Sequence, residues 1–190
     1  MSRRLTFVKH ARPHKEERLD SHQWSLSDEG RADARRLAER LQHSGLTYHA
    51  VFTSAEPKAA ETAAILAECF GLTPKTVTGL QEHDRSNVPL MKTAEFVSSI
   101  ELFFRKPTQL VLGRETARQA LRRFESAVDQ LLEQHPQGNL LIVSHGTVLA
   151  LWLANYCQLD GYRVWREMGL PSYVTLEWPA CELLERVDRL

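Results

Sequence analysis

The feature that most constrains the fold is a short apolar run that stops abruptly at a basic, histidine-containing loop. Residues 5–8 (Leu-Thr-Phe-Val) lead directly into residues 9–13 (Lys-His-Ala-Arg-Pro). A short apolar run bounded by a breaker is typical of a buried parallel strand. Ligands of open α/β sheets bind just outside the carboxyl ends of such strands. The sequence therefore predicts a functional site at His10.

The same arrangement recurs late in the chain. Residues 140–143 (Leu-Leu-Ile-Val) form a second apolar run, which ends in Ser144, His145 and Gly146. Because ligands gather at the carboxyl ends of parallel strands, we expect His10 and His145 to meet in one crevice.

Strand-like and helix-like segments alternate through the rest of the chain. Apolar spacing predicts helices between Ser27 and Gly45 and at 56–70, 96–104, 114–134 and 146–158, and further strands at 48–53, 75–78, 173–178 and 182–187. This order favours an α/β three-layer sandwich, in which a mostly parallel central sheet has helices on both faces and one antiparallel strand. With 190 residues, we expect one domain spanning residues 1–190.

The composition excludes several classes of function. Hydrophobic residues make up 43% and charged residues 25% of the chain, which is ordinary for a globular protein. The 24 Lys and Arg residues balance the 24 Asp and Glu residues, so the basic footprint of a nucleic-acid-binding protein is absent. The most apolar segment, 140–157, is interrupted by polar residues and does not predict a membrane span. Neither nucleic acid nor a membrane is an expected partner.

The N-terminus and the cysteines favour a cytoplasmic protein. Residues 1–4 lead into only four apolar-type residues before Lys9, which is too short for a signal-peptide core. Cys69, Cys157 and Cys181 are far apart and lack C-x-x-C spacing, so we expect buried, reduced thiols. No segment has metal-site spacing, and no metal is expected. A homodimer formed through the late strands is one arrangement that the sequence allows.

The side chains expected at the strand ends suit the chemistry of a phosphoryl group. Besides the two histidines, these residues are Lys9, Arg12, Ser54, Lys58, Glu82 and Gly146. Cations neutralise phosphate oxygens, an imidazole can attack phosphorus and carry the group, and a carboxylic acid can protonate the leaving oxygen. Lys58 falls in the first turn of its helix and Gly146 opens another, so exposed N–H groups there are expected to add anion affinity.

Taken together, these motifs resemble the histidine phosphatase superfamily, the phosphoglycerate-mutase-like proteins. The family's first strand ends in Arg-His-Gly, where this chain has Lys9-His10-Ala11. The further matches, in family order across nearly the whole chain, are Leu26-Ser27-Asp28-Glu29-Gly30, Ser54 with Lys58-Ala59 and Thr62-Ala63, Leu80-Gln81-Glu82, and Ser144-His145-Gly146.

The resemblance implies a role for each matching residue. His10 would be the nucleophile that becomes phosphohistidine, and Glu82 would be the proton donor. Lys9, Lys58 and His145 would line the phosphate pocket. The resemblance also implies catalysis without a metal or organic cofactor, and a small phosphorylated molecule or inorganic phosphate as the ligand.

Two departures from the family pattern leave alternatives open. Both pocket arginines of the pattern are lysines here, Lys9 and Lys58, and lysine lacks the planar fork that grips two phosphate oxygens. Each lost contact would cost about 1–3 kcal/mol, unless Arg12 or Arg85 supplies a fork instead. The sequence therefore predicts a phosphatase, with a catalytically weak or silent phosphate-binding or regulatory protein of the same fold as the alternative.

The acid motif leaves a second choice open. It lacks the Gly-x-x-Glu-Gly continuation that is common in the mutase branch, so phosphatase activity is favoured over mutase activity. Asp84 lies two residues from Glu82 and is its rival as proton donor. The sequence does not identify the substrate, because the segments 12–25 and 82–107 are the least regular of the chain.

Overall fold

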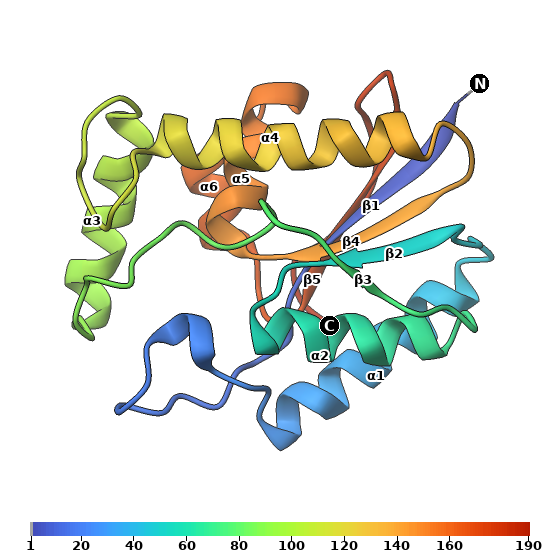
Figure 1. Cartoon of the computed structure of the whole chain (residues 1–190), viewed down its shortest axis with the longest axis horizontal. Helices are drawn as coiled ribbons and strands as arrows, with labels where there is room; N and C mark the ends of the chain where they lie inside the picture. Colours follow the sequence, from blue (N-terminus) through green and yellow to red (C-terminus); the bar gives the residue numbers. More distant parts are fainter. Residues whose placement is uncertain (1) are drawn as a thin grey trace.

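The structure is a computed structural model that describes residues 2–190, and in it a six-stranded sheet lies between two layers of helices (Figure 1). The strands are β1 (Arg3–Lys9), β2 (Ala50–Thr53), β3 (Lys75–Thr76), β4 (Leu140–Ser144), β5 (Ser172–Trp178) and β6 (Glu182–Val187). The helices are η1 (Ser21–Gln23), α1 (Asp28–His43), α2 (Pro57–Glu68), α3 (Thr93–Arg105), α4 (Ala117–Gln134), α5 (Gly146–Cys157) and α6 (Gly161–Glu167).

The strand order is β3-β2-β4-β1-β5-β6. Parallel pairing joins β1 to β4, β4 to β2, and β2 to β3. Strand β5 pairs antiparallel with both β1 and β6, so it alone runs against the others in residues 2–190. The structure thus confirms the predicted three-layer α/β sandwich with a mostly parallel sheet and one antiparallel strand.

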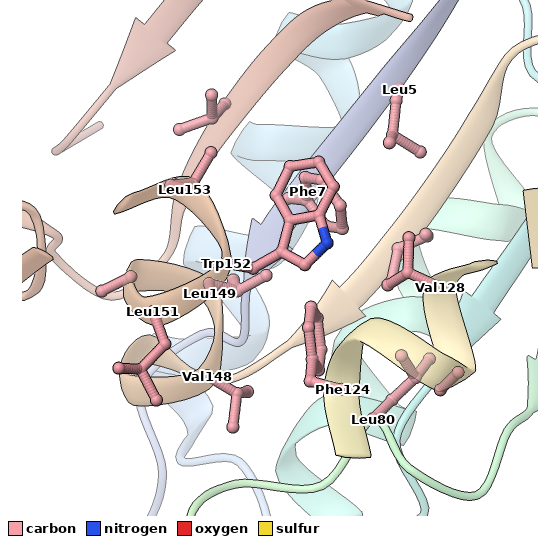
Figure 2. Packing of buried hydrophobic residues seen from close by; sticks show 14 of the residues in the cluster. Leu5, Phe7, Leu80, Phe124, Val128, Val148, Leu149, Leu151, Trp152 and Leu153 are labelled. Carbon is pink, nitrogen blue, oxygen red and sulfur yellow. The ribbon is translucent and has the colours of Figure 1, made fainter. Parts of the chain in front are cut away.

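Alternating side chains of the central strands divide the hydrophobic core into two layers. Ile142 of β4 packs in the layer under α4 and α5, whereas the next residue, Val143, packs in the layer over α1 and α2. Figure 2 shows the first layer, in which the Phe7 ring centroid lies 4.6 Å from that of Trp152 and 6.2 Å from that of Phe124. Burial on both faces explains why these strands are continuous apolar runs.

The arrangement of the helices determines where the site forms. The helices that follow β1 and β2 cover one face of the sheet, whereas α5, which follows β4, covers the other face (Figure 1). Because β4 lies between β1 and β2, the connections diverge at the carboxyl ends of these three strands. Such a switch point is where open α/β sheets bind ligands. His10, Ser54 and His145 follow the three strands directly.

Some predicted boundaries differ from the structure. Strand β3 has two residues instead of the predicted four, because it pairs with β2 only over Lys75 and Thr76. Helix α6 was not expected, since seven residues are too few to show apolar periodicity. A local signal was nevertheless present: Asp160 caps α6 by accepting a hydrogen bond from the backbone N–H of Arg163 (2.9 Å).

The prediction of buried cysteines is wrong. All three thiols are free, but Cys69 is exposed and both Cys157 and Cys181 are partly exposed. Cys69 directly follows the last residue of α2, at a helix end on the protein surface. A separate finding concerns membranes: between residues 2 and 190, no helix is both long and apolar enough to cross one.

Candidate active site

His10 directly follows β1 and is buried, with 7% of its surface exposed. Its backbone N–H donates to the carbonyl of Ser144 at the end of β4 (3.0 Å). In the ring, Nδ1 lies 2.7 Å from the carbonyl oxygen of Ala11, so Nδ1 carries the proton and donates it there. Burial, followed by the charges of His145 and Lys58, holds the pKa of His10 well below its usual value. The ring is therefore neutral, with its lone pair on Nε2.

The second histidine, His145, faces His10 with 5.1 Å between the ring centroids. Its side chain is fully buried, and Nε2 lies 2.8 Å from Ser54 Oγ and 3.3 Å from Glu56 Oε1. Burial, partly offset by the charge of Glu82, lowers the pKa of His145 to about 3. The other ring nitrogen, Nδ1, is buried and has no hydrogen-bond partner among residues 2–190.

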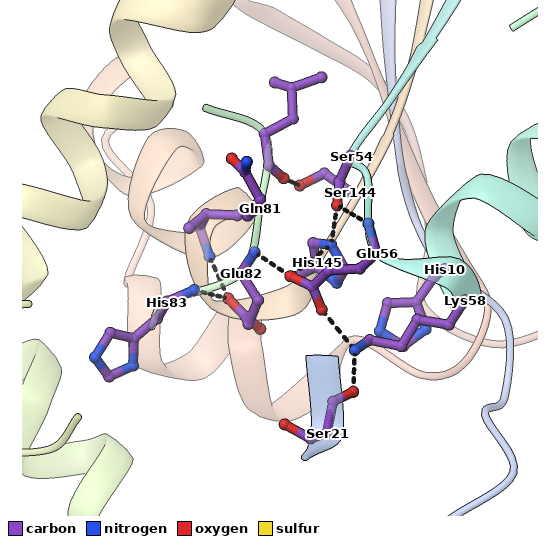
Figure 3. Close-up of polar contacts among 12 residues, drawn as sticks. His10, Ser21, Ser54, Glu56, Lys58, Gln81, Glu82, His83, Ser144 and His145 are labelled. Atoms are coloured by element: carbon purple, nitrogen blue, oxygen red, sulfur yellow. Dashed lines mark hydrogen bonds and ion pairs between the residues drawn. The ribbon is translucent and has the colours of Figure 1, made fainter. Parts of the chain in front are cut away.

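Lys58 lies in the first turn of α2 and is also buried. Its Nζ donates to Glu56 Oε2 (2.6 Å) and to the carbonyl of Ser21 (2.6 Å), as Figure 3 shows. The backbone N–H of Lys58 donates to the carbonyl of Trp24 (3.1 Å). The expectation of an exposed N–H group at Lys58 is therefore wrong, because the loop after β1 folds back over the start of α2.

Glu56 is a site residue that sequence reasoning missed. It is 7% exposed, and besides its contacts with Lys58 and His145 its Oε1 accepts the backbone N–H of Glu82 (2.8 Å). In the sequence it precedes a helix with Pro57 at the first position, where a carboxylate is usually solvated. The available signal was its position two residues before Lys58, inside the motif that carries the family resemblance.

The Glu82 carboxylate lies on the N-terminal turn of α5. Its oxygens accept backbone N–H groups from Thr147 (3.1 Å) and Val148 (3.3 Å), and a third from His83 (2.9 Å). A helix N-terminus is a natural site for an anion, since its N–H groups lack partners within the helix. An internal carboxylate therefore occupies the helix start that Gly146 opens.

The electrostatics of Glu82 keep it ionised in the free protein. Burial raises its pKa, but the charges of Arg85 and His145 and the backbone hydrogen bonds outweigh burial and lower the pKa of Glu82 to about 2. Arg85 Nη2 lies 3.8 Å from Glu82 Oε2. Asp84 is exposed, and its carboxylate accepts the backbone N–H (3.0 Å) and the hydroxyl (2.7 Å) of Ser86. The structure thus places Glu82 beside His145, Lys58 and Glu56, in a buried cluster that also includes His10, whereas Asp84 lies in a surface turn.

Lys9, the last residue of β1, lies against Gly146 at the start of α5. Its Nζ donates to the carbonyl of Met168 (2.8 Å), and its stem crosses Gly146, where a Cβ would lie 3.0 Å from Lys9 Cε. The absence of a side chain at Gly146 therefore leaves room for the lysine. Burial, partly offset by the charge of Glu82, lowers the pKa of Lys9 to about 8, so the amine is mostly charged at neutral pH.

Arg12 and Arg85 are the two arginines that could supply the planar fork that Lys9 and Lys58 lack, and they lie in different places. Arg12 is exposed, and its backbone carbonyl accepts the N–H of Ser27 at the start of α1 (3.0 Å). Its charge lowers the pKa of Glu29, behind larger effects from hydrogen bonds at that helix start. Arg85 instead lies beside Glu82 and over the ring of Phe96, with 4.9 Å between its Cζ and the ring centroid. The structure thus brings Arg85, rather than Arg12, to a carboxylate of the cluster.

Two cavities adjoin the cluster. The first, about 630 Å³, is lined by Glu56 and Glu82 together with Ser21 and Arg85. The second, about 530 Å³, shares Ser21 and Arg85 with the first, and its apolar walls are Leu19, Trp24, Val88, Leu90, Met91 and Phe96. Across residues 2–190, no group of three or more His, Cys, Asp or Glu side chains is arranged to hold a metal ion.

Comparison with known proteins identifies the family. The family model of the histidine phosphatase superfamily (branch 1) matches residues 5–184. The chain therefore belongs to this superfamily, as the resemblance predicts. No curated protein matches the chain.

Solved structures share the fold at low sequence identity. A mycobacterial glucosyl-3-phosphoglycerate phosphatase is 21% identical with a TM-score of 0.78, and the match covers 100% of both chains. Its complex with inorganic phosphate is 22% identical with a TM-score of 0.74, over 98% of this chain and 95% of the other. YhfR of Bacillus stearothermophilus is 23% identical with a TM-score of 0.75, over 97% and 96% of the two chains.

Proposed function

We propose that the protein is a phosphatase that hydrolyses a small phosphorylated molecule through a phosphohistidine on His10. One observation carries this proposal: the His10 ring is neutral, donates from Nδ1 to Ala11, and so presents a lone pair on Nε2 within a cluster of cations. A neutral imidazole held in this way is a competent nucleophile. Membership of the histidine phosphatase superfamily supports the same reaction.

In the first step, His10 Nε2 attacks phosphorus, the bond from phosphorus to the ester oxygen breaks, and the leaving oxygen takes a proton from Glu82. Glu82 is ionised in the free protein, but a phosphate dianion placed beside it raises its pKa, because like charges disfavour ionisation. A proton brought by the substrate or by solvent then resides on Glu82. In the second step, water attacks the phosphohistidine, Glu82 accepts the proton of the water, and inorganic phosphate and His10 are released.

The cations of the cluster stabilise the charge on the transferred group. Lys58, Lys9 and Arg85 approach from three different segments, so they can face different phosphate oxygens. Two of these three are lysines, which act as point charges rather than as forks. The organic part of the substrate would lie in the two cavities that share Ser21 and Arg85, both of which have charged and apolar walls.

A phosphoenzyme trap tests the proposal. Wild type and His10→Ala are incubated with an activated aryl phosphate, quenched in base, and weighed by mass spectrometry. We expect an added phosphoryl group on wild type alone, and a loss of turnover in the variant of at least about 10³-fold, since removal of a nucleophile can cost up to about 10⁶-fold. Turnover by His10→Ala close to the wild-type rate would contradict a phosphohistidine mechanism.

The second candidate is a phosphate-binding or regulatory protein that does not turn over its ligand. The buried pair of Lys58 and Glu56 favours it, because a carboxylate at 2.6 Å offsets the lysine charge that would stabilise the transition state of phosphoryl transfer. This candidate predicts that vanadate or tungstate binds while no phosphoenzyme forms and the aryl phosphate stays intact. Failure of every oxyanion to bind would count against both candidates.

A further inference from the structure

Glu56 contacts three groups of the candidate active site through one carboxylate. Oε2 accepts from Lys58 Nζ (2.6 Å), while Oε1 accepts the backbone N–H of Glu82 (2.8 Å) and lies 3.3 Å from His145 Nε2 (Figure 3). Its side chain is 8% exposed and that of Lys58 is 7% exposed, so water screens these contacts poorly. Glu56 thus links a cation, a histidine and the segment that carries the acid.

We propose that Glu56 is a positioning residue that aims Lys58 at the phosphoryl group and holds the proton of His145 on Nε2. In this role it allows a lysine to serve where the family pattern has an arginine. The inference rests on the proposed function and deepens it, because it assigns a residue outside the matched motif positions to the phosphate pocket.

The contacts of Lys58 show how Glu56 orients the lysine amine. A lysine amine is a point charge with three donors on a flexible stem, whereas arginine carries a planar fork with built-in direction. Glu56 Oε2 and the carbonyl of Ser21 take two of the three donors of Lys58, each at 2.6 Å. The tetrahedral geometry of the amine then fixes the direction of the third donor, which remains for an incoming oxyanion.

The contacts of His145 show how its proton is placed. Nε2 faces two oxygens, Ser54 Oγ and the Glu56 carboxylate, and a carboxylate can only accept a hydrogen bond. The proton of the neutral ring therefore lies on Nε2, and Nδ1 holds a buried lone pair with no partner within residues 2–190. A buried polar atom of this kind calls for a partner. A protonated phosphate oxygen would supply one.

Simple charge counting predicts the opposite effect of Glu56, which makes the inference testable. The other charges that act on the two histidines are Lys9, Lys58, Arg85 and Arg123, against Glu82. A second buried carboxylate lowers the net positive charge, so on electrostatics alone its removal would tighten anion binding. Positioning predicts that its removal weakens binding. The sign of the change separates the two.

The test compares wild type with Glu56→Gln, which has almost the same shape without the charge. We measure the Kd of vanadate and the kcat/KM of an aryl phosphate, and confirm the fold by circular dichroism. We expect vanadate binding and kcat/KM to fall by roughly 10- to 100-fold, the scale of hydrogen bonds to charged groups. If Glu56→Gln does not fold, Glu56→Asp replaces it and is expected to change both quantities in the same direction. Unchanged or tighter vanadate binding would overturn the inference.

A double-mutant cycle with Lys58→Arg tests the lysine contact. Because an arginine has its own fork, the loss caused by Glu56→Gln should be at least about threefold smaller in the Lys58→Arg background. An equal loss in both backgrounds would overturn the proposed contact between Glu56 and Lys58.

The ¹⁵N chemical shifts of the His145 ring report which ring nitrogen carries the proton, and a merely structural role of Glu56 would not change them. The Nε2–H form is expected in wild type, and an unchanged tautomer in Glu56→Gln would overturn the His145 part.

These outcomes are distinct from a failure of the proposed function. If wild type forms no phosphoenzyme, the vanadate and ¹⁵N measurements still decide whether Glu56 positions the pocket of a binding protein. If His10→Ala abolishes turnover while Glu56→Gln leaves vanadate affinity unchanged, the phosphatase proposal stands and the role of Glu56 is refuted.

Discussion

Two connections from a strand to a helix contribute to the candidate active site, and they differ in charge: a lysine lies at the β2–α2 corner and a carboxylate at the β4–α5 corner. At the β2–α2 corner the first helical N–H groups are used within the chain, and the side chain of Lys58, held by Glu56, supplies positive charge. At the β4–α5 corner the N–H groups of Thr147 and Val148 remain directed at an anion, but that anion is the carboxylate of Glu82.

This difference shows that a helix start following a strand does not by itself make a phosphate site. At the start of α2 the N–H of Lys58 donates to the carbonyl of Trp24, and the next two N–H groups donate to the carbonyl of Glu56. At the start of α5 the carboxylate of Glu82 accepts the N–H groups. Under the proposed function, phosphate would therefore be bound by side chains, namely the two histidines and the cations.

The largest effect is expected at the β4–α5 corner, from Glu82→Gln. The amide cannot deliver a proton, and general acid catalysis contributes about 10²- to 10⁴-fold. Turnover of an alkyl phosphate, whose leaving oxygen needs a proton, should fall by this amount. Turnover of p-nitrophenyl phosphate should fall much less, because its leaving group departs as an anion. Steady-state kinetics on both substrates measures the ratio.

Asp84→Asn is the matched control for that measurement. Asp84 lines the same cavity as Glu82, but it is exposed and its carboxylate bonds to Ser86 instead of to His145, Lys58 or the start of α5. This variant should therefore change turnover of either substrate less than about twofold. A loss of turnover in Asp84→Asn as large as that in Glu82→Gln would contradict the role of Glu82 as the proton donor at the β4–α5 corner and would favour Asp84.

At the β2–α2 corner, Lys58→Ala should lower stability more than Lys9→Ala does. Removal of Lys58 leaves Glu56 as a buried charge without its cation, which costs about 3–5 kcal/mol of unfolding free energy. Removal of Lys9 forfeits one hydrogen bond from a charged amine to a carbonyl, worth about 1.5–3 kcal/mol. Urea denaturation of the three proteins measures both values. Equal losses would show that the Lys58–Glu56 pair is not the cause.

The smallest effect is a pH dependence that separates the two lysines. The pKa of Lys9 is lowered to about 8, so its positive charge is present below pH 8 and is lost as the pH rises through that value. We therefore expect kcat/KM, which reports groups of the free enzyme, to decline above pH 8 by at most tenfold per pH unit. Lys9→Arg keeps its charge and should remove the decline. A profile unchanged in Lys9→Arg would assign the decline to another group.

Much of the fold was readable because its signals are local. The runs at residues 5–8 and 140–143 are buried on both faces of the sheet, so nearly every position in them is apolar. The breakers that follow place His10 and His145 at strand ends without knowledge of the rest of the chain. Helix α6 was not predicted because about two helical turns show little apolar periodicity, although Asp160 marked its start.

From the amino-acid sequence alone the family and the sandwich could be predicted, together with several side chains at the strand ends, although Glu56 was missed. The protonation and the hydrogen bonds of those side chains follow from the tertiary fold. The sequence predicts a solvated carboxylate for Glu56, because this residue precedes a helix. In the structure Glu56 is buried, because the segment of Glu82 packs against it and the loop at Ser21 packs against its partner Lys58. Protonation and hydrogen bonding depend on what covers a group, and here the covering segments are distant in the chain. Because this burial depends on distant segments, the pattern of residues predicted where the site lies but not which of its side chains are charged.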